Sequence, residues 1–259
     1  MIKLRLLLFI GLVFLGKGLF AQGVVPAWAS GADEVDWSFG FTFQYITSDY
    51  KIDKKPDWRS PFYDPASGLK LTDTLNSISS KSSPGFALGF IARYRLTDHL
   101  EARVTPMFVF SDRLLEFEYA STSGNPLLAS KAIPLTPTLL EETVQTTSFD
   151  IPLSMKLKSD RLGNFRGYLL GGVKYSLLIA GNKAVASNSL VDKLVKNSGG
   201  FASYEVGIGC DLYFEYFKLS PEFKISNSFG NIIVPDNNPY SRPIDKLFLH
   251  TFMFSLYFE

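Results

Sequence analysis

The chain has few of the residues from which disulfides and metal sites are built. Its 259 residues include one cysteine and two histidines. One cysteine cannot form an internal disulfide, and so few thiol and imidazole groups disfavour a Cys-rich or His-rich metal site. Neither sign of charge dominates, because 26 basic residues face 25 acidic ones. This balance argues against a nucleic-acid-binding protein, which would carry a basic excess.

Long apolar runs are scarce as well. The mean hydropathy is only +0.09, which is too polar for a protein with several membrane-spanning helices. The one candidate run lies near the N-terminus, where Lys3 and Arg5 are followed by LLLFIGLVFLGKGLFA. Because Lys17 interrupts this run, it is short for a spanning helix of about 20 apolar residues. We predict a secretory signal peptide over residues 1–21, with an uncleaved N-terminal anchor as the alternative.

Aromatic residues, by contrast, are abundant at 15% of the chain, and they recur with a period of two. In residues 36–45, every odd position from Trp37 to Tyr45 is aromatic, whereas the even positions after Asp36 hold Ser, Gly, Thr and Gln. Such alternation predicts a β-strand with one apolar face. Seven further strands are predicted in the same way, over residues 86–96, 100–110, 149–157, 166–178, 202–214, 217–225 and 250–259. In 166–178 both faces are apolar, and Arg166 and Lys174 suggest that the even positions form the polar face.

The connections between these strands alternate in length. Three are short, at residues 97–99, 159–164 and 215–216, and four are long, at about 47–83, 112–142, 179–200 and 227–246. Strands of this length can cross a bilayer at a tilt, and outer-membrane barrels alternate short periplasmic turns with long extracellular loops. We therefore predict an all-β fold, an eight-stranded antiparallel transmembrane β-barrel of the OmpX and OmpA kind over residues 36–259. A periplasmic segment over 22–35 would precede it. A soluble β-sandwich is the alternative, because it shares the alternation.

The polar face of the strands predicts a charged barrel interior. An eight-stranded barrel is only wide enough for side chains to fill it, and buried charges are tolerated when they are paired. We therefore expect a packed network of ion pairs rather than an open conduit. The predicted members are Arg93, Arg95, Glu101, Arg103, Asp150, Lys156, Arg166, Lys174, Glu205, Asp211, Glu222 and Lys224.

No catalytic, cofactor-binding or metal-binding residues are predicted. His250 and Ser255 have opposite parity in the last strand, so they form no base–nucleophile pair. The Gly-Ile-Gly sequence at 207–209 lies within a strand and does not form a phosphate-binding loop. We expect outer-membrane lipid as a partner and no nucleic acid. The apolar segment around 125–140 is a candidate protein contact, since exposed apolar patches commonly mark interfaces.

Three prolines inside predicted strands are unusual, because each removes a ladder donor. They occur in the sequences VTPMF, FDIPLSMKLKS and LSPEFK. With the blocks NFRGYLLGGVKYS and YFKLSPEFK, they make residues 36–259 resemble the PorT (SprT) family of the Bacteroidota. That resemblance implies a non-enzymatic barrel that serves type IX secretion, the export of proteins with a C-terminal sorting domain. It also implies secretion-machine partners, bound through loops or periplasmic turns. A generic structural or adhesion barrel is the alternative.

Overall fold

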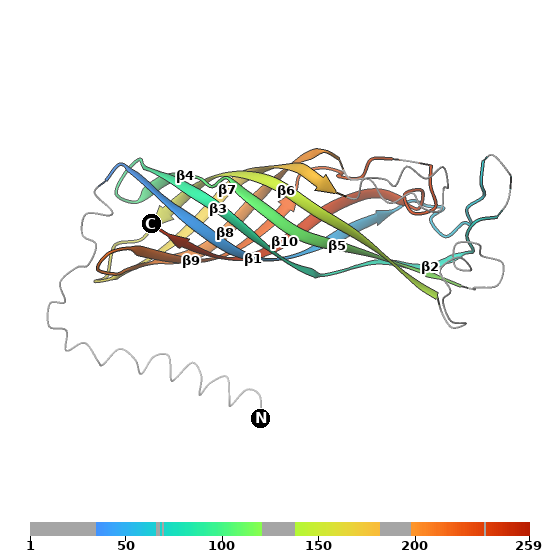
Figure 1. Cartoon of the computed structure of the whole chain (residues 1–259), viewed down its shortest axis with the longest axis horizontal. Helices are drawn as coiled ribbons and strands as arrows, with labels where there is room; N and C mark the ends of the chain where they lie inside the picture. Colours follow the sequence, from blue (N-terminus) through green and yellow to red (C-terminus); the bar gives the residue numbers. More distant parts are fainter. Residues whose placement is uncertain (1–34, 66–67, 69, 121–137, 182–197, 236) are drawn as a thin grey trace, which may run out of the picture.

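The computed structural model describes residues 35–65, 68, 70–120, 138–181, 198–235 and 237–259. These residues form one antiparallel sheet that closes into a barrel (Figure 1). The strands are β1 (Trp37–Lys54), β2 (Leu75–Lys81), β3 (Ser83–Arg95), β4 (Leu100–Val104), β5 (Met107–Tyr119), β6 (Thr138–Lys158), β7 (Phe165–Gly181), β8 (Gly200–Tyr213), β9 (Lys218–Ser228) and β10 (Ile244–Phe258). The predicted signal peptide lies outside the described residues, as does nearly all of the segment 22–35.

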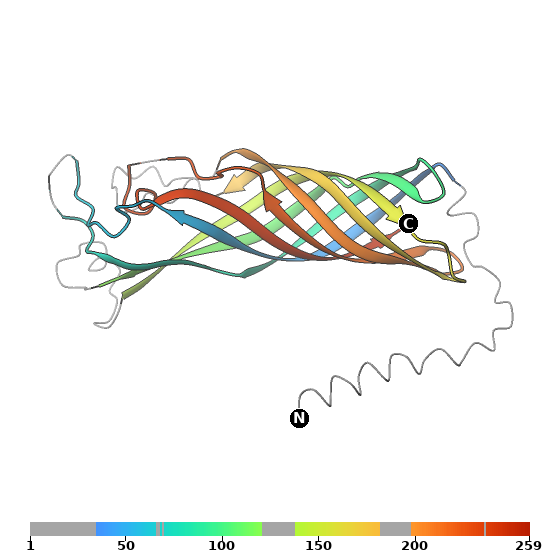
Figure 2. The same ribbon diagram turned by 180° about the vertical axis from the view of Figure 1, so that it is seen from behind.

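The barrel closes because β1 pairs with both β3 and β10. Phe41 lies opposite Phe90 on one side and opposite Phe258 on the other. The segments β2 and β3 form one interrupted crossing, and β4 and β5 form another, so the ten segments make eight crossings. The predicted eight-stranded antiparallel barrel is thus confirmed. Short turns join one end, where β1 starts and β10 stops, and long connections join the other (Figures 1 and 2). By the rule for outer-membrane barrels, we call these the periplasmic and extracellular ends.

The break between β4 and β5 has a local cause in Pro106. Proline has no N–H to donate to the ladder, so regular pairing stops at Val104 and resumes at Met107. The wall nevertheless stays closed there, because the Phe90 N–H donates to the Pro106 carbonyl at 3.0 Å. A glycine faces this point: a Cβ added to Gly89 would lie 2.4 Å from the same carbonyl oxygen. The kinked strand therefore needs a residue without a side chain opposite it.

Several strands extend beyond their predicted ends on the extracellular side. The strand β1 continues to Lys54, β5 to Tyr119, and β6 already begins at Thr138. The sequence signal ends too early because the polarity of the wall inverts along the strands. Near the periplasmic end the outward residues of β1 are aromatic, whereas Lys51 and Asp53 point outward near the extracellular end. An alternation that reverses its phase weakens the sequence signal, although the ladder continues.

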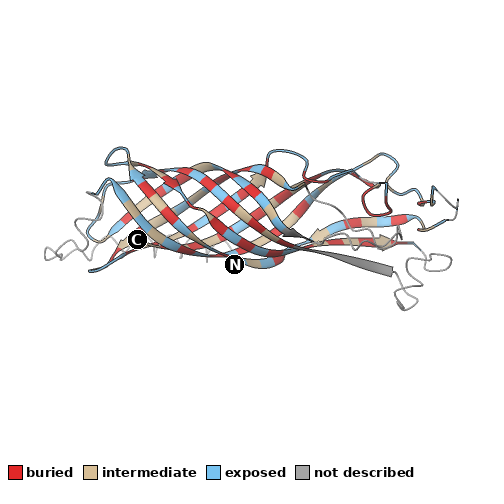
Figure 3. Ribbon diagram, turned by 45° about the horizontal axis from the view of Figure 1, so that its top comes forward, coloured by how far each residue is buried: buried red, intermediate tan, exposed pale blue. Residues whose placement is uncertain are grey.

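The interior changes character along the same axis. Buried residues alternate with more exposed ones along most of the described wall (Figure 3), and charged side chains fill the periplasmic part of the interior. At the extracellular end the buried residues are instead apolar. Phe117 of β5 meets Tyr240 of the connection 229–243 edge to face at 5.6 Å, and Ile232 and Ile233 of that connection are also buried. This apolar core closes the extracellular mouth.

Candidate functional site

The buried side chains of the barrel interior form the candidate site. Eleven of the twelve predicted network residues are buried inside the barrel; they are Arg93, Glu101, Arg103, Asp150, Lys156, Arg166, Lys174, Glu205, Asp211, Glu222 and Lys224. The inward parity of β7 is the even one, as Arg166 and Lys174 suggested.

Arg95 does not join the interior. Its side chain is 28% exposed at the periplasmic rim, 3.3 Å from Asp98 and 3.5 Å from Asp36. Arg95 is the last residue of β3, so the chain has already reached the turn at this position. A long side chain at a strand end can turn toward water, which a parity rule does not take into account.

An inner charge cluster occupies the periplasmic end of the interior. The Arg93 guanidinium donates to Glu101 at 2.7 Å and to Glu259 at 2.8 Å. Lys158 also donates to Glu101, and Lys156 donates to both carboxylate oxygens of Asp211 at 2.8 and 2.9 Å. Lys218 lies 3.0 Å from Glu259. The cluster consists of Arg93, Glu101, Lys156, Lys158, Asp211, Lys218 and Glu259, and it joins strands from around the barrel.

An ion pair crosses the middle of the interior. Nη2 of Arg103, on β4, donates to both carboxylate oxygens of Glu222, on β9, at 2.9 and 2.8 Å. The guanidinium also lies over the Tyr257 ring, 4.3 Å from its centroid. The Tyr257 hydroxyl in turn accepts a hydrogen bond from Lys224 at 2.7 Å. Glu205 adds its negative charge near Lys224.

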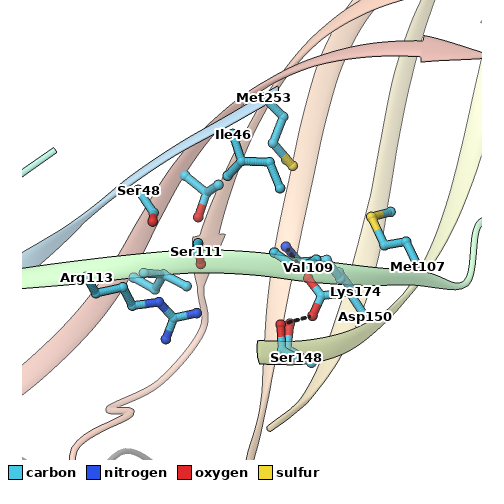
Figure 4. Close-up of a pocket in the computed structure, with 13 residues that line it drawn as sticks. Ile46, Ser48, Met107, Val109, Ser111, Arg113, Ser148, Asp150, Lys174 and Met253 are labelled. Atoms are coloured by element: carbon cyan, nitrogen blue, oxygen red, sulfur yellow. Dashed lines mark hydrogen bonds and ion pairs between the residues drawn. The ribbon is translucent and has the colours of Figure 1, made fainter. Parts of the chain in front are cut away.

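A third set of interacting polar side chains lies further toward the extracellular end. Lys174 of β7 lies 3.0 Å from Asp150 of β6, and the Ser148 hydroxyl donates to the same carboxylate at 2.9 Å. These residues line a cavity of about 20 Å³ (Figure 4). Arg113 of β5 lines it as well. The cavity lies between the charged interior and the apolar core.

Arg166 connects the barrel to its turns. Its guanidinium donates to the backbone carbonyls of Ser159 at 2.6 Å and of Asp98 at 2.5 Å. The same two turns also meet outside the barrel, where His99 Nε2 lies 3.0 Å from Asp160. The hydrogen bond from His99 lowers the pKa of the exposed Asp160 carboxyl below its ordinary value. Both contacts hold the periplasmic turns together.

Sequence reasoning missed four interior charges: Arg113, Lys158, Lys218 and Glu259. Arg113 and Lys158 lie just beyond predicted strand ends, yet they share the parity of Val109 and Lys156, so extending each strand would have found them. Lys218 lies on the polar face of a predicted strand and was available from the same parity. Glu259, whose side chain is 3% exposed, is the next odd residue after Tyr257 in the last predicted strand, so the alternation also places it on the inner face.

The arrangement provides packing and charge compensation inside the barrel. Among the residues that the structure describes, no group of three or more His, Cys, Asp and Glu is placed to hold a metal ion. None of the described residues forms a helix with the length and apolar character of a membrane span. His250 faces outward and lies 2.6 Å from the Asn227 side-chain oxygen, across the wall from the interior charges.

The outer wall carries the second functional feature, a belt of exposed apolar side chains. Phe90 is 72% exposed and Phe39 is 69% exposed. Neighbouring strands contribute aromatic pairs, such as Phe86 with Phe110 at 5.1 Å. An apolar surface of this extent is expected against lipid and not against water. A closed barrel with a lipid-facing belt and a charged, filled interior is an outer-membrane β-barrel.

Comparison with known proteins gives the family. The model described as outer membrane protein beta-barrel domain matches residues 35–234, and the chain belongs to this family. The protein is accordingly located in the outer membrane, and lipid contacts its apolar belt.

Several solved structures are similar to the chain at low identity. OprG from Pseudomonas aeruginosa is 14% identical, with a TM-score of 0.42, over 86% of this chain and 92% of OprG. Ail of Yersinia pestis is 13% identical, with a TM-score of 0.36, over 86% of this chain and 99% of Ail. Neisserial surface protein A is 12% identical, with a TM-score of 0.34, over 85% and 97% of the two chains. No curated protein matches the chain.

Proposed function

We propose that the protein is a non-enzymatic barrel component of type IX secretion, and that it acts through its surfaces. The observation that carries this proposal is the role of the two most specific blocks of the PorT resemblance. The block 164–176 supplies Arg166 and Lys174 to the interior, and the block 216–224 supplies Lys218, Glu222 and Lys224. Residues that carry the resemblance are thus among those that fill this barrel.

A filled interior supports a contact role rather than a conduit. Ion pairs occupy the interior at the inner charge cluster and at Arg103–Glu222, and the apolar core around Phe117 closes the extracellular mouth. The interior of an eight-stranded barrel is too narrow for a polypeptide to pass once the barrel's own side chains fill it. Any part in secretion would therefore use the long extracellular connections or the periplasmic turns.

Gene deletion tests the proposal. We expect the deletion strain to retain cargo with C-terminal sorting domains in the periplasm, and the wild-type gene to restore export. Replacement of residues 122–137, which lie outside the described residues, by a Gly/Ser linker should weaken export and leave the barrel inserted. Normal export by the deletion strain would remove the secretion role, and a generic structural or adhesion barrel would then be the better description.

A further inference from the structure

Arg113 is a buried cation for which no ion pair is found among the side chains that the structure describes. It points inward from β5 and is 3% exposed. Its Nε and Nη1 atoms have no hydrogen-bond partner among the described residues. Its guanidinium carbon lies 5.9 Å from the ring centroids of both Tyr50 and Phe201, near the outer limit of a cation–π contact. Because arginine stays protonated in proteins, this side chain needs an acceptor and a counter-charge.

The cavity beside Arg113 holds other groups suited to an anion. Hydroxyls of Ser111, Ser48 and Thr251 line it, and the Ser48 hydroxyl has no partner in the described part of the chain. The carboxylate in this lining, Asp150, already pairs with Lys174 and accepts a hydrogen bond from Ser148. In Figure 4 the Arg113 side chain reaches toward the side where Ser148 and Asp150 lie. The remaining lining is largely apolar and supplies no further negative charge.

The same imbalance is found among the interior side chains whose burial the structure describes, a set that leaves out residues 138–145 of β6. The buried cations in the described ranges are Arg93, Arg103, Arg113, Lys156, Lys158, Arg166, Lys174, Lys218 and Lys224. The buried carboxylates are Glu101, Asp150, Glu205, Asp211, Glu222 and Glu259. Nine cations thus face six carboxylates among the side chains described, with Glu142 of β6 outside this count. An uncompensated charge in a protein interior is strongly unfavourable, and a water molecule would satisfy hydrogen bonds without supplying negative charge.

We propose that this cavity binds a single halide ion, chloride under ordinary conditions, against Arg113. The cavity volume of about 20 Å³ suits one small, compact ligand, since a water-sized group needs at least about 10–15 Å³ on this measure. It leaves no room for a sugar, a nucleotide or a carboxylate with a side group. The guanidinium donates to the halide, and the free Ser48 hydroxyl is positioned in the same lining to donate as well.

Bromide locates the ion directly. Crystals of the detergent-solubilised mature barrel grown in sodium bromide should show an anomalous peak within hydrogen-bond distance of the Arg113 guanidinium. The Arg113→Met variant should lose this peak. Bromide found only at the protein surface in the wild type would overturn the proposal.

The second measurement is unfolding in matched salts. Replacing sodium gluconate by sodium chloride at constant ionic strength should stabilise the wild type, by about tenfold in the folding equilibrium when chloride is ten times its dissociation constant. Arg113→Met should fold at least as well in gluconate, because it removes an uncompensated charge, and should not respond to chloride. The rim variant Arg95→Met is the matched control and should keep the wild-type response.

A protein counter-ion is the competing explanation, and one variant separates it. Glu142 of β6 lies opposite Leu115 in the ladder, two residues along from Arg113. If the wild type is indifferent to chloride and Glu142→Gln makes it chloride-dependent, a carboxylate compensates Arg113 and the halide site is refuted. Chloride dependence that persists in Arg113→Met would also refute it.

Discussion

Removing the Glu222 carboxylate should destabilise the barrel more than any change at its rim. In Glu222→Ala, Arg103 would stay 2% exposed and would lose both of its carboxylate contacts, at 2.9 and 2.8 Å. Breaking a buried ion pair from one side typically costs about 3–5 kcal/mol, because a charge is left uncompensated in the interior. The Tyr257 ring, 4.3 Å from the guanidinium, contacts Arg103 in the wild type as well, so this contact does not reduce the expected loss.

The expected loss is therefore about 3–5 kcal/mol. Reversible guanidinium unfolding in lipid vesicles, followed by tryptophan fluorescence, measures it. Asp36→Ala is the matched control: it breaks a pair of 3.5 Å whose members are 28% and 66% exposed, so about 0–1 kcal/mol is expected. The double variant Arg103→Met, Glu222→Leu should recover most of the stability. Equal losses in Glu222→Ala and Asp36→Ala, or no recovery in the double variant, would refute the reasoning.

Three further outcomes follow from the closed, filled barrel. Unboiled mature protein should migrate differently from boiled protein on a gel, because a closed barrel has no free edge from which detergent can unfold it; identical mobility would contradict closure. Wild-type protein in planar bilayers should show near-zero conductance, and steady porin-sized currents would mean that the interior is open. His99→Ala should raise the pKa of Asp160, which the His99 hydrogen bond lowers. The stabilisation from that contact is present at neutral pH and is lost as the pH falls through the pKa of Asp160, as carboxyl NMR titration would show.

The membrane-embedded part of the fold could be predicted from alternation alone. From Trp37 to Tyr45 every outward residue is aromatic, because lipid on one side and a polar interior on the other impose opposite demands on successive residues. Beyond that belt water lies outside and an apolar core lies inside. The alternation then reverses its phase, and the outer parts of β1 and β5 were consequently predicted as loops.

The interior residues were predictable as a set but not as pairs. Parity places Arg103 and Glu222 on the inner face, yet they are 119 residues apart in sequence. Their meeting depends on which strands close the ring and how those strands are staggered. Arg95 shows that parity can also predict burial wrongly, because this residue has the inward parity but lies where the strand ends. Partner identity therefore needs the three-dimensional register.

The inversion of wall polarity also sets how far the protein stands above the lipid. The strand β1 has 18 residues, which at about 3.3 Å per residue and a tilt of about 40° span roughly 45 Å along the barrel axis. The apolar belt of such a barrel is about 25 Å tall. Roughly 20 Å of hydrogen-bonded wall would therefore project into the extracellular space before any loop begins. The extracellular end of the barrel would therefore lie well above the lipid headgroups. The height of this end would affect how a binding partner approaches as much as the sequence of the loops does.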